Sequence, residues 1–217
     1  QKQFITDAGH ELKTPITVIA TSLKVLEMES GENKWIDKSL AQTEKLRDLV
    51  NSLVSLSRLD EEQSPLKMAE FPISEAISET AESFRDYAEA NGHELQLEIA
   101  PALTYTGDEY AIRQLVSILL DNAVKYADEH ACIKLSLEKG KKGPVIRTMN
   151  PCTGLTRQQV ERLFDRFYRV DQSRTTGGFG IGLSMARSIA EGHKGSIKAT
   201  CCEENKIEFT VLLGKCV

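Results

Sequence analysis

The hydrophobic positions of the first 59 residues follow the period of an α-helix in two separate stretches. In the first stretch, apolar residues recur at spacings of three, four and seven: Ile5, Leu12, Ile16, Ile19, Leu23 and Leu26. This stripe is typical of an amphipathic helix that packs in a bundle. A second helical pattern runs from Ile36 to Leu59, and the segment SGENK between them indicates a turn. The pattern therefore predicts a helical hairpin whose first helix extends to about Met28.

A polar segment that contains a proline, DEEQSPLK at residues 60–67, follows the second helix. Such a composition is typical of a linker, so we expect two domains, residues 1–62 and residues 63–217. A helical hairpin has too little interior to be stable alone, whereas two copies related by a two-fold axis make a four-helix bundle. The first domain therefore predicts a homodimer.

The periodicity changes beyond the linker, where helical and alternating segments follow one another. Helices are expected at residues 73–90, 108–127, 156–167 and 182–191. Strands are expected at residues 93–99, 131–137, 145–149, 196–200 and 207–213. The expected class is α+β: the helical hairpin, then an α/β sandwich with helices on one side of a mixed, mainly antiparallel sheet.

The composition excludes several kinds of function. The chain has 217 residues, 41% hydrophobic residues and a net charge of -5, which gives no basic surface for nucleic acid. Its five cysteines are odd in number and form no C-x-x-C pair, so we expect reduced thiols, neither a disulfide framework nor zinc. No run of about 18 apolar residues is present. Since the chain starts inside a helical pattern, we expect a fragment whose missing N-terminal part could contain membrane segments. With reduced thiols, the present sequence would then be the cytoplasmic portion of a membrane-anchored protein.

The first helix carries a candidate nucleophile away from its apolar stripe. His10 directly precedes Glu11, and Pro15 removes a backbone donor one turn later. A helix that packs on one face and presents an imidazole beside a carboxylate on another can serve nucleophilic catalysis. A histidine and a glutamate on an exposed helix face are the ordinary alternative.

The segment LLDNAVKYAD places Asn122, Lys125 and Tyr126 within about one helical turn of each other. An amide oxygen can complete the shell of Mg²⁺, a lysine can neutralise phosphate, and a tyrosine ring can lie against a base. These residue types therefore suit a nucleotide, although an exposed helix turn can have the same composition.

A glycine segment, TTGGFGIGLSMARS, leads directly into the last expected helix. Glycines allow close approach of the backbone, and a helix N-terminus offers free amides to a phosphate. A dinucleotide-binding fold would need a strand before these glycines. The preceding segment is LFDRFYRVDQSR instead, which reads as a helix end followed by a polar loop.

The segment FITDAGHELKTPITVI resembles the phosphoacceptor box of sensor histidine kinases. LLDNAVKYAD, LFDRFYRVDQSR and GGFGIGL resemble, in order and spacing, the N, F and G2 boxes of their ATP-binding domain. The resemblance covers nearly the whole chain. It implies a dimeric four-helix bundle followed by a Bergerat-type sandwich that binds ATP and Mg²⁺ under a lid.

The resemblance also implies roles for individual residues of the first domain. His10 would accept the γ-phosphoryl group of ATP, with Glu11 as the base, and would pass it to an aspartate of a response regulator receiver domain. Thr14 would help to orient a water that dephosphorylates that partner. A threonine bonding back to the preceding helical turn is the plain alternative.

For the nucleotide, the resemblance implies Asn122 as the Mg²⁺ ligand, Lys125 as a phosphate contact and Tyr126 as a packing residue. It also implies contacts from the lid and its flanks: Arg166, Gly178, Gly180, Gly182 and Leu183. Phe164 and Phe167 would hold the base of the lid by packing.

One box departs from the family pattern. In TMNPCTGLT, Asn150 occupies the place of an aspartate that accepts from the adenine amine, and Cys152 replaces a glycine. Gly154 remains, and the resemblance implies that it contacts the nucleotide together with Asn150. Ile118 replaces a second asparagine before the Mg²⁺ ligand. An amide oxygen still accepts a hydrogen bond but lacks charge, so we expect weaker ATP binding than is usual in the family.

Two alternatives remain at this point. A degenerate kinase would act mainly as a receiver-binding scaffold or phosphatase, which the altered box favours. A gyrase-type or chaperone-type ATPase of the same superfamily would need a glutamate base near Asn122, where the nearest acid is Asp121, and has no use for the His10 box.

Overall fold

The computed structural model describes residues 2–31, 33–59, 66–170, 180–202 and 205–215. Within the first two helices, the side chains of residues 2–11, 14, 30, 45, 48–49 and 51–59 lie outside this description. Most of the linker expected at residues 60–67 also lies outside it. No helix in the described part of the chain combines the length and apolarity that crossing a membrane requires.

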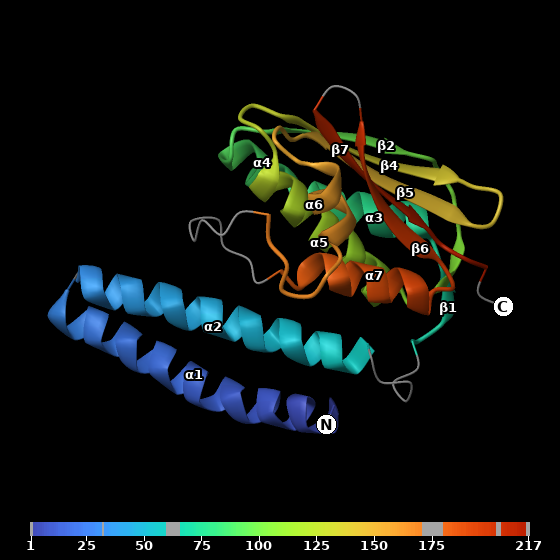
Figure 1. Cartoon of the computed structure of the whole chain (residues 1–217). Helices are drawn as coiled ribbons and strands as arrows, with labels where there is room; N and C mark the ends of the chain where they lie inside the picture. Colours follow the sequence, from blue (N-terminus) through green and yellow to red (C-terminus); the bar gives the residue numbers. More distant parts are fainter. Residues whose placement is uncertain (1, 32, 60–65, 171–179, 203–204, 216–217) are drawn as a thin grey trace.

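The N-terminal region is the expected helical hairpin, α1 (Lys2–Ser30) and α2 (Lys34–Leu59), whose helices run side by side in opposite directions (Figure 1). Gly31 has a φ of +77° at the turn, a conformation that favours glycine. Asn33 then accepts the Trp35 N–H at 2.9 Å and so begins α2. Ile16 and Val50 are buried between the helices.

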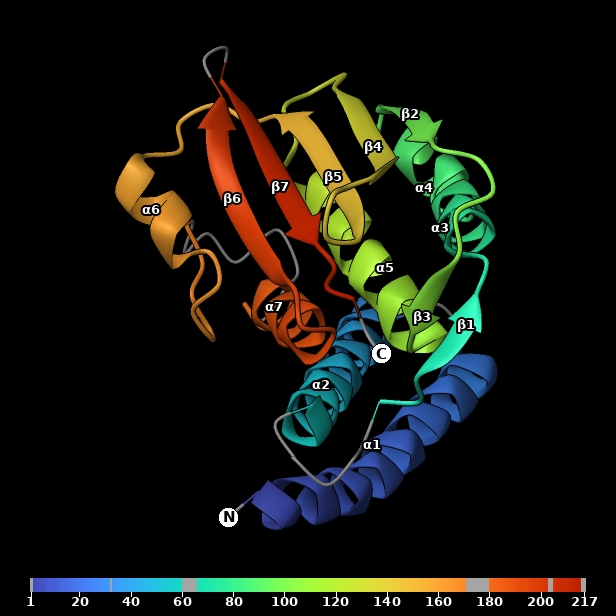
Figure 2. The same ribbon diagram turned by 90° about the vertical axis from the view of Figure 1, so that its right-hand side faces the viewer.

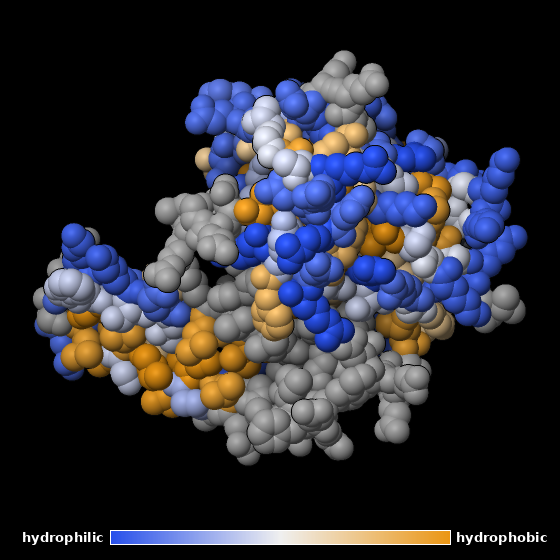
Figure 3. Space-filling model, viewed as in Figure 1, coloured by the Kyte–Doolittle hydropathy of each residue, from blue (hydrophilic) through white to orange (hydrophobic). Residues whose placement is uncertain are grey.

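Several apolar side chains of the hairpin remain exposed in the single chain. They are Leu12, Val18, Ile19, Val25, Leu26, Met28, Trp35 and Leu46. Figure 3 shows hydrophobic residues gathered on this part of the molecule. Contiguous apolar surface of this kind usually marks an interaction face.

The second region contains a five-stranded sheet in the order β2-β4-β5-β7-β6. The strands are β2 (Glu94–Ile99), β4 (Cys132–Lys139), β5 (Pro144–Pro151), β6 (Ser196–Cys202) and β7 (Lys206–Leu212). The pair β2–β4 is parallel and the other pairs are antiparallel. The expected mixed, mainly antiparallel sheet is therefore confirmed.

Helices cover one face of this sheet (Figures 1 and 2). They are α3 (Ile73–Glu82), α4 (Arg85–Ala90), α5 (Glu109–Tyr126), α6 (Arg157–Arg162) and α7 (Gly182–Gly192). The core lies between these helices and the sheet, where Leu119, Ile133 and Ile146 are fully buried. The helix α2 lies against α7, which brings the hairpin next to the sandwich (Figure 1).

The structure differs from the sequence pattern in three places. The helix expected at 73–90 breaks into two, because the Ser83 hydroxyl donates to the Thr80 carbonyl at 2.7 Å and competes with the helical backbone pattern. The helix expected at 156–167 ends at Arg162, and Phe167 has a φ of +64° that no helix allows. A short sheet of β1 (Ala69–Phe71) and β3 (Tyr105–Gly107) was not predicted, because three residues are too few to show an alternating pattern.

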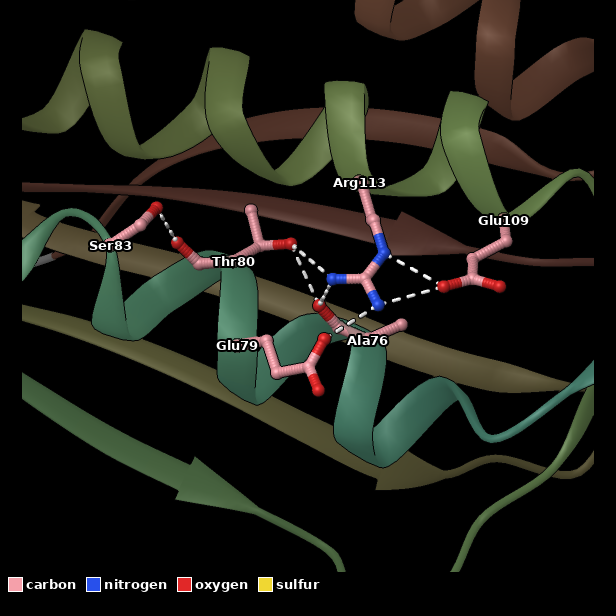
Figure 4. A network of polar contacts seen from close by, with 6 residues as sticks. All are labelled: Ala76, Glu79, Thr80, Ser83, Glu109 and Arg113. Carbon is pink, nitrogen blue, oxygen red and sulfur yellow. Dashed lines mark hydrogen bonds and ion pairs between the residues drawn. The ribbon is translucent and has the colours of Figure 1, made fainter.

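Arg113 joins α3 to α5 (Figure 4). Its Nη2 lies 2.8 Å from Glu79 Oε2 and 2.7 Å from Glu109 Oε1, and its Nη1 donates to the Ala76 carbonyl at 3.0 Å. The guanidinium thus contacts two carboxylates and the backbone of α3 together. Since such half-exposed ion pairs contribute little energy individually, Arg113 connects the two helices but should add little to the stability of the fold.

Candidate functional site

Helix α5 carries three of the predicted site residues near its C-terminal end. The helix begins at Asp108, whose Oδ1 accepts the Ala111 N–H at 3.0 Å as an N-cap. Its apolar face is buried against the sheet, which leaves Asn122 and Lys125 half-buried and Tyr126 39% exposed. Because these residues are three and four positions apart, they lie on neighbouring parts of the helix surface.

Lys125 is paired within its own helix in this structure. Its Nζ lies 2.6 Å from Asp121 Oδ2, and both side chains are partly exposed. A phosphate would therefore compete with Asp121 for the ammonium group. The ion pair holds the ammonium group beside Asp121 on the surface of α5.

The start of α7 lies beside α5. A Cβ added at Gly182 would be 3.3 Å from Ile118 Cγ2, one turn before Asn122, and Gln114 Nε2 lies 3.2 Å from Met185 Sδ. Leu183 is buried at 8% exposure, so it packs rather than facing solvent. The structure thus brings the free amides at the α7 N-terminus close to the Asn122 helix, which suits a phosphate.

Gly180, just before α7, lies against the backbone of Phe167 and Tyr168, which follow α6. Its φ is +69°, and a Cβ there would lie 2.7 Å from both the Phe167 carbonyl carbon and the Tyr168 oxygen. The Phe167 N–H donates to the Gly180 carbonyl at 2.8 Å. Only glycine at position 180 fits this contact. The other predicted glycine of this segment, Gly178, lies outside the described residues.

The two phenylalanines expected to pack at the lid base behave differently. Phe164 packs edge-on against Phe209, with ring centroids 6.2 Å apart. Phe167 is 60% exposed, so the expectation that its ring packs there is wrong. The left-handed turn at Phe167 directs its backbone, rather than its ring, to Gly180. Arg166 is exposed beside it.

Asn150 lies at the end of β5 and is only 2% exposed. Its Nδ2 donates to the Pro151 carbonyl at 3.0 Å. Its Oδ1 is buried and has no hydrogen-bond partner among the described residues, and the same holds for Thr148 Oγ1. Buried oxygens of this kind are rare because an unmade hydrogen bond costs about 1–3 kcal/mol. The free acceptor therefore fits a ligand that brings a donor, such as the amino group of adenine.

Gly154 follows Asn150 in an exposed turn with a φ of +81°. A Cβ at this position would meet nothing within 4 Å. The glycine is thus explained by its backbone conformation, and its predicted contact with a nucleotide stays a prediction.

The donor chemistry suits Mg²⁺ better than a transition metal. No group of three or more His, Cys, Asp or Glu side chains in the described ranges could hold a metal ion. Mg²⁺ in nucleotide sites keeps several waters and uses few protein ligands alongside the phosphates. A single amide oxygen, that of Asn122, is consistent with such a site.

His10, Glu11 and Thr14 lie within α1, which continues through Pro15. Their side chains are outside the described part of the chain. Their predicted roles therefore stay predictions.

Two polar residues near Asn150 were missed from the sequence. Thr148 lies two positions before Asn150 on β5, so the alternation of the strand could have placed it on the same face. Asp128 lies just after α5, and no periodicity or spacing in the sequence relates it to Asn150. Its contacts arise only when α5 and the end of β5 come together.

Comparisons with known proteins agree with this geometry. Residues 107–215 match the model of the histidine kinase-, DNA gyrase B-, and HSP90-like ATPase, and residues 1–62 match the His Kinase A (phospho-acceptor) domain. Sensor protein DltS of Streptococcus agalactiae is 34% identical, over 92% of this chain and 51% of DltS. Sensor protein CiaH of Streptococcus pneumoniae is 32% identical, over 97% of this chain and 48% of CiaH. The chain therefore spans about half the length of these curated relatives.

Solved structures share the fold. Full-length ShkA in complex with AMPPNP aligns with a TM-score of 0.80 at 21% identity, covering 100% of this chain and 47% of ShkA. The Acinetobacter baumannii histidine kinase AdeS aligns with a TM-score of 0.69 at 23% identity, covering 94% and 97%. These likenesses extend over both the hairpin and the sandwich.

Proposed function

Since this chain belongs to the sensor histidine kinases, we propose that it phosphorylates His10 from ATP and passes the phosphoryl group to an aspartate of a response regulator. The hairpin, residues 1–62, is the dimerisation and phosphotransfer domain, and residues 63–217 form the ATP-binding domain. The observation that carries the ATP assignment is the buried Oδ1 of Asn150 near α5, which has no hydrogen-bond partner in the described part of the chain.

The nucleotide lies, in this proposal, between α5, the end of β5 and the start of α7. Asn150 accepts from the adenine amine, and Tyr126 packs against the base or ribose. Lys125 exchanges Asp121 for a phosphate, and Gly180 and Gly182 let the backbone approach the phosphates together with Gly178 and Arg166. Asn122 would hold Mg²⁺, which when bound would supply positive charge against the phosphates. ShkA, the similar structure named above, contains AMPPNP.

The transfer needs a neutral imidazole at His10. One ring nitrogen of His10 attacks the γ-phosphorus while the bond from phosphorus to the bridging oxygen breaks, and ADP leaves. Glu11 accepts the proton from the other ring nitrogen as the ring loses electron density. Positioning and charge neutralisation supply most of the catalysis, as in other phosphoryl transfers.

A homodimer accounts for the apolar face of the hairpin. Leu12, Ile19 and Leu26 are each 49% exposed in the single chain. Two hairpins packed face to face would bury these side chains in a four-helix bundle. The bundle would also offer the docking surface for the receiver domain, near which Thr14 would orient a water in a phosphatase reaction. Attachment to a membrane would come through segments outside this sequence.

The acceptor that Asn150 retains supports nucleotide binding, and so argues against a degenerate kinase that acts mainly as a receiver-binding scaffold or phosphatase. The match of residues 1–62 to the phospho-acceptor domain speaks against a gyrase-type or chaperone-type ATPase. Phosphatase activity is compatible with the proposed kinase, because both use the same bundle.

Incubation with ATP labelled at the γ-phosphate tests the proposal. The label should be stable in alkali and lost in acid, as phosphohistidine is, and it should require Mg²⁺. His10→Ala should abolish incorporation, whereas His130→Ala, at an exposed histidine outside α1, should retain it. Full labelling of His10→Ala would refute the assignment.

A further inference from the structure

Asp128 connects the end of α5 to the segment that follows β5. Its Oδ1 and Oδ2 each lie 3.1 Å from the Thr153 N–H nitrogen, and Oδ1 also accepts from the Thr153 hydroxyl at 3.1 Å. Its own N–H donates to the Pro151 carbonyl at 3.1 Å. One residue therefore holds this segment at two points, on either side of Cys152.

The Pro151 carbonyl oxygen is shared between two donors. It accepts the Asp128 N–H and also the Asn150 Nδ2–H, at 3.0 Å. Because a carbonyl oxygen can only accept, the nitrogen end of the Asn150 amide must face Pro151. The oxygen end, Oδ1, is then the buried end that has no hydrogen-bond partner among the residues that the structure describes.

The position of the Pro151 carbonyl thus decides which end of the Asn150 amide a ligand meets. An oxygen accepts from the amino group of adenine and repels the oxo group that guanine carries at the same place. If the amide turned over, its N–H would donate to guanine instead. The choice between the two bases therefore depends on the contacts that hold Pro151.

We propose that Asp128 is a positioning residue for nucleobase recognition. It holds the Pro151–Thr153 segment in place, and the Asn150 side chain therefore presents Oδ1 to the base. This inference rests on the proposed function, in which Asn150 accepts from the adenine amine. Asp128 also lies two residues after Tyr126, at the end of α5 that carries Lys125 and Tyr126. The same residue thus links the base contact of β5 to the nucleotide-binding end of α5.

The segment has a second, independent anchor. The Cys152 N–H donates to the Asn205 carbonyl at 2.7 Å, near the start of β7. Removal of the Asp128 carboxylate should therefore loosen the segment on the α5 side while the strand pairing of β5 and β7 keeps the domain folded.

The test compares Asp128→Ala with Asp128→Asn by titration calorimetry, using ATP, GTP and purine riboside triphosphate, which lacks the 6-amino group. Asp128→Ala should weaken ATP about fivefold, the equivalent of one neutral hydrogen bond. It should leave purine riboside triphosphate unchanged and narrow the preference for ATP over GTP. Asp128→Asn keeps Oδ1, which receives both Thr153 donors, but replaces the second acceptor, Oδ2, with an N–H group. It should therefore restore ATP binding only in part and bind ATP more tightly than Asp128→Ala.

Asp86→Ala, at an exposed aspartate of α4, is the matched control and should bind all three nucleotides as the unmodified protein does. If Asp128→Ala weakened the binding of ATP and of purine riboside triphosphate equally, Asp128 would hold the segment without a role in base recognition. That result would overturn the inference. Unchanged ATP binding in Asp128→Ala would also overturn it. Asn150→Ala distinguishes a failure of the Asp128 inference from a failure of the proposed base contact. If this variant binds ATP as tightly as the unmodified protein, the proposed contact between Asn150 and the adenine amine is wrong.

Discussion

His193 Nε2 accepts the Asp108 N–H at 3.0 Å, and its Nδ1 lies 2.8 Å from the Ile189 carbonyl. A backbone N–H can only donate and a carbonyl can only accept, so the imidazole is neutral with its proton on Nδ1. The ring is completely buried. It joins the end of α7 to Asp108, the residue that caps α5, and so holds together the two helices of the proposed nucleotide site.

Stability should fall in mild acid because of His193. Burial lowers the pKa of this imidazole below its ordinary value of 6.5. Below about pH 6.5 the unfolded chain binds a proton at this histidine that the folded protein does not bind. The contribution of His193 to the free energy of unfolding is therefore fully present above this pH and decreases as the pH falls below it. The slope from one such group is at most about 1.4 kcal/mol per pH unit.

Urea denaturation at several pH values from neutral to mildly acidic measures this effect. His193→Gln should be less stable at neutral pH but show a smaller loss in acid than the unmodified protein. His130→Gln, at an exposed histidine, should keep the original pH dependence. Equal slopes in His193→Gln and the unmodified protein would contradict the assignment.

Thr148→Val should stabilise the nucleotide-free protein. The Thr148 hydroxyl is fully buried without a hydrogen-bond partner in the described structure, and valine has nearly the same shape. Removal of the unsatisfied group should gain about 1 kcal/mol in the free energy of unfolding. Thr148→Ser keeps the hydroxyl and should not show the gain. A loss of stability in Thr148→Val would indicate that an ordered water satisfies the hydroxyl.

Asn150→Asp should destabilise the nucleotide-free protein by about 2 kcal/mol, because a buried carboxylate would face the Pro151 carbonyl without a donor between them. The present Nδ2–O distance there is 3.0 Å. Thermal denaturation with and without ATP measures the effect, and addition of ATP should raise the melting temperature more in the variant than in the unmodified protein. Unchanged stability of the free variant would mean that the side chain rotates away from Pro151.

Gly180→Ala should cost about 1 kcal/mol more than Gly31→Ala. Both glycines have positive φ, +69° and +77°, but only at Gly180 would a Cβ meet backbone atoms, at 2.7 Å. The comparison therefore separates the clash from the shared backbone strain. Chemical denaturation gives the free energies, and equal losses would show that the Phe167–Tyr168 segment moves aside easily.

Ile19→Glu should convert the proposed dimer to a monomer. The side chain is 49% exposed on the apolar face of the hairpin, and an unpaired charge buried in a bundle interface is strongly unfavourable. Sedimentation at micromolar concentration measures the association. Lys24→Glu changes charge at a position that is already polar and exposed, and should remain dimeric. A monomeric unmodified protein would remove the basis of the prediction.

Periodicity was sufficient for the parts of the fold that depend on local pattern. The hairpin, the helix around Asn122 and the strands of the mixed sheet bury a continuous apolar face, so their spacing is visible in the residues themselves. The break at Ser83 and the early end of α6 were missed, because single side-chain hydrogen bonds and one left-handed residue leave the apolar pattern unchanged.

For the site, the motifs and their order along the chain were enough to indicate the family and an ATP-binding domain, whereas the role of His10 stays a prediction. They could not show that Asn150 turns its oxygen away from Pro151, that Lys125 pairs with Asp121, or that Asp128 holds the segment around Pro151. These relationships join residues whose separation in sequence is unrelated to their distance in space. A hydrogen bond depends on the direction and distance of two groups, and both are set only once α5 packs against β5.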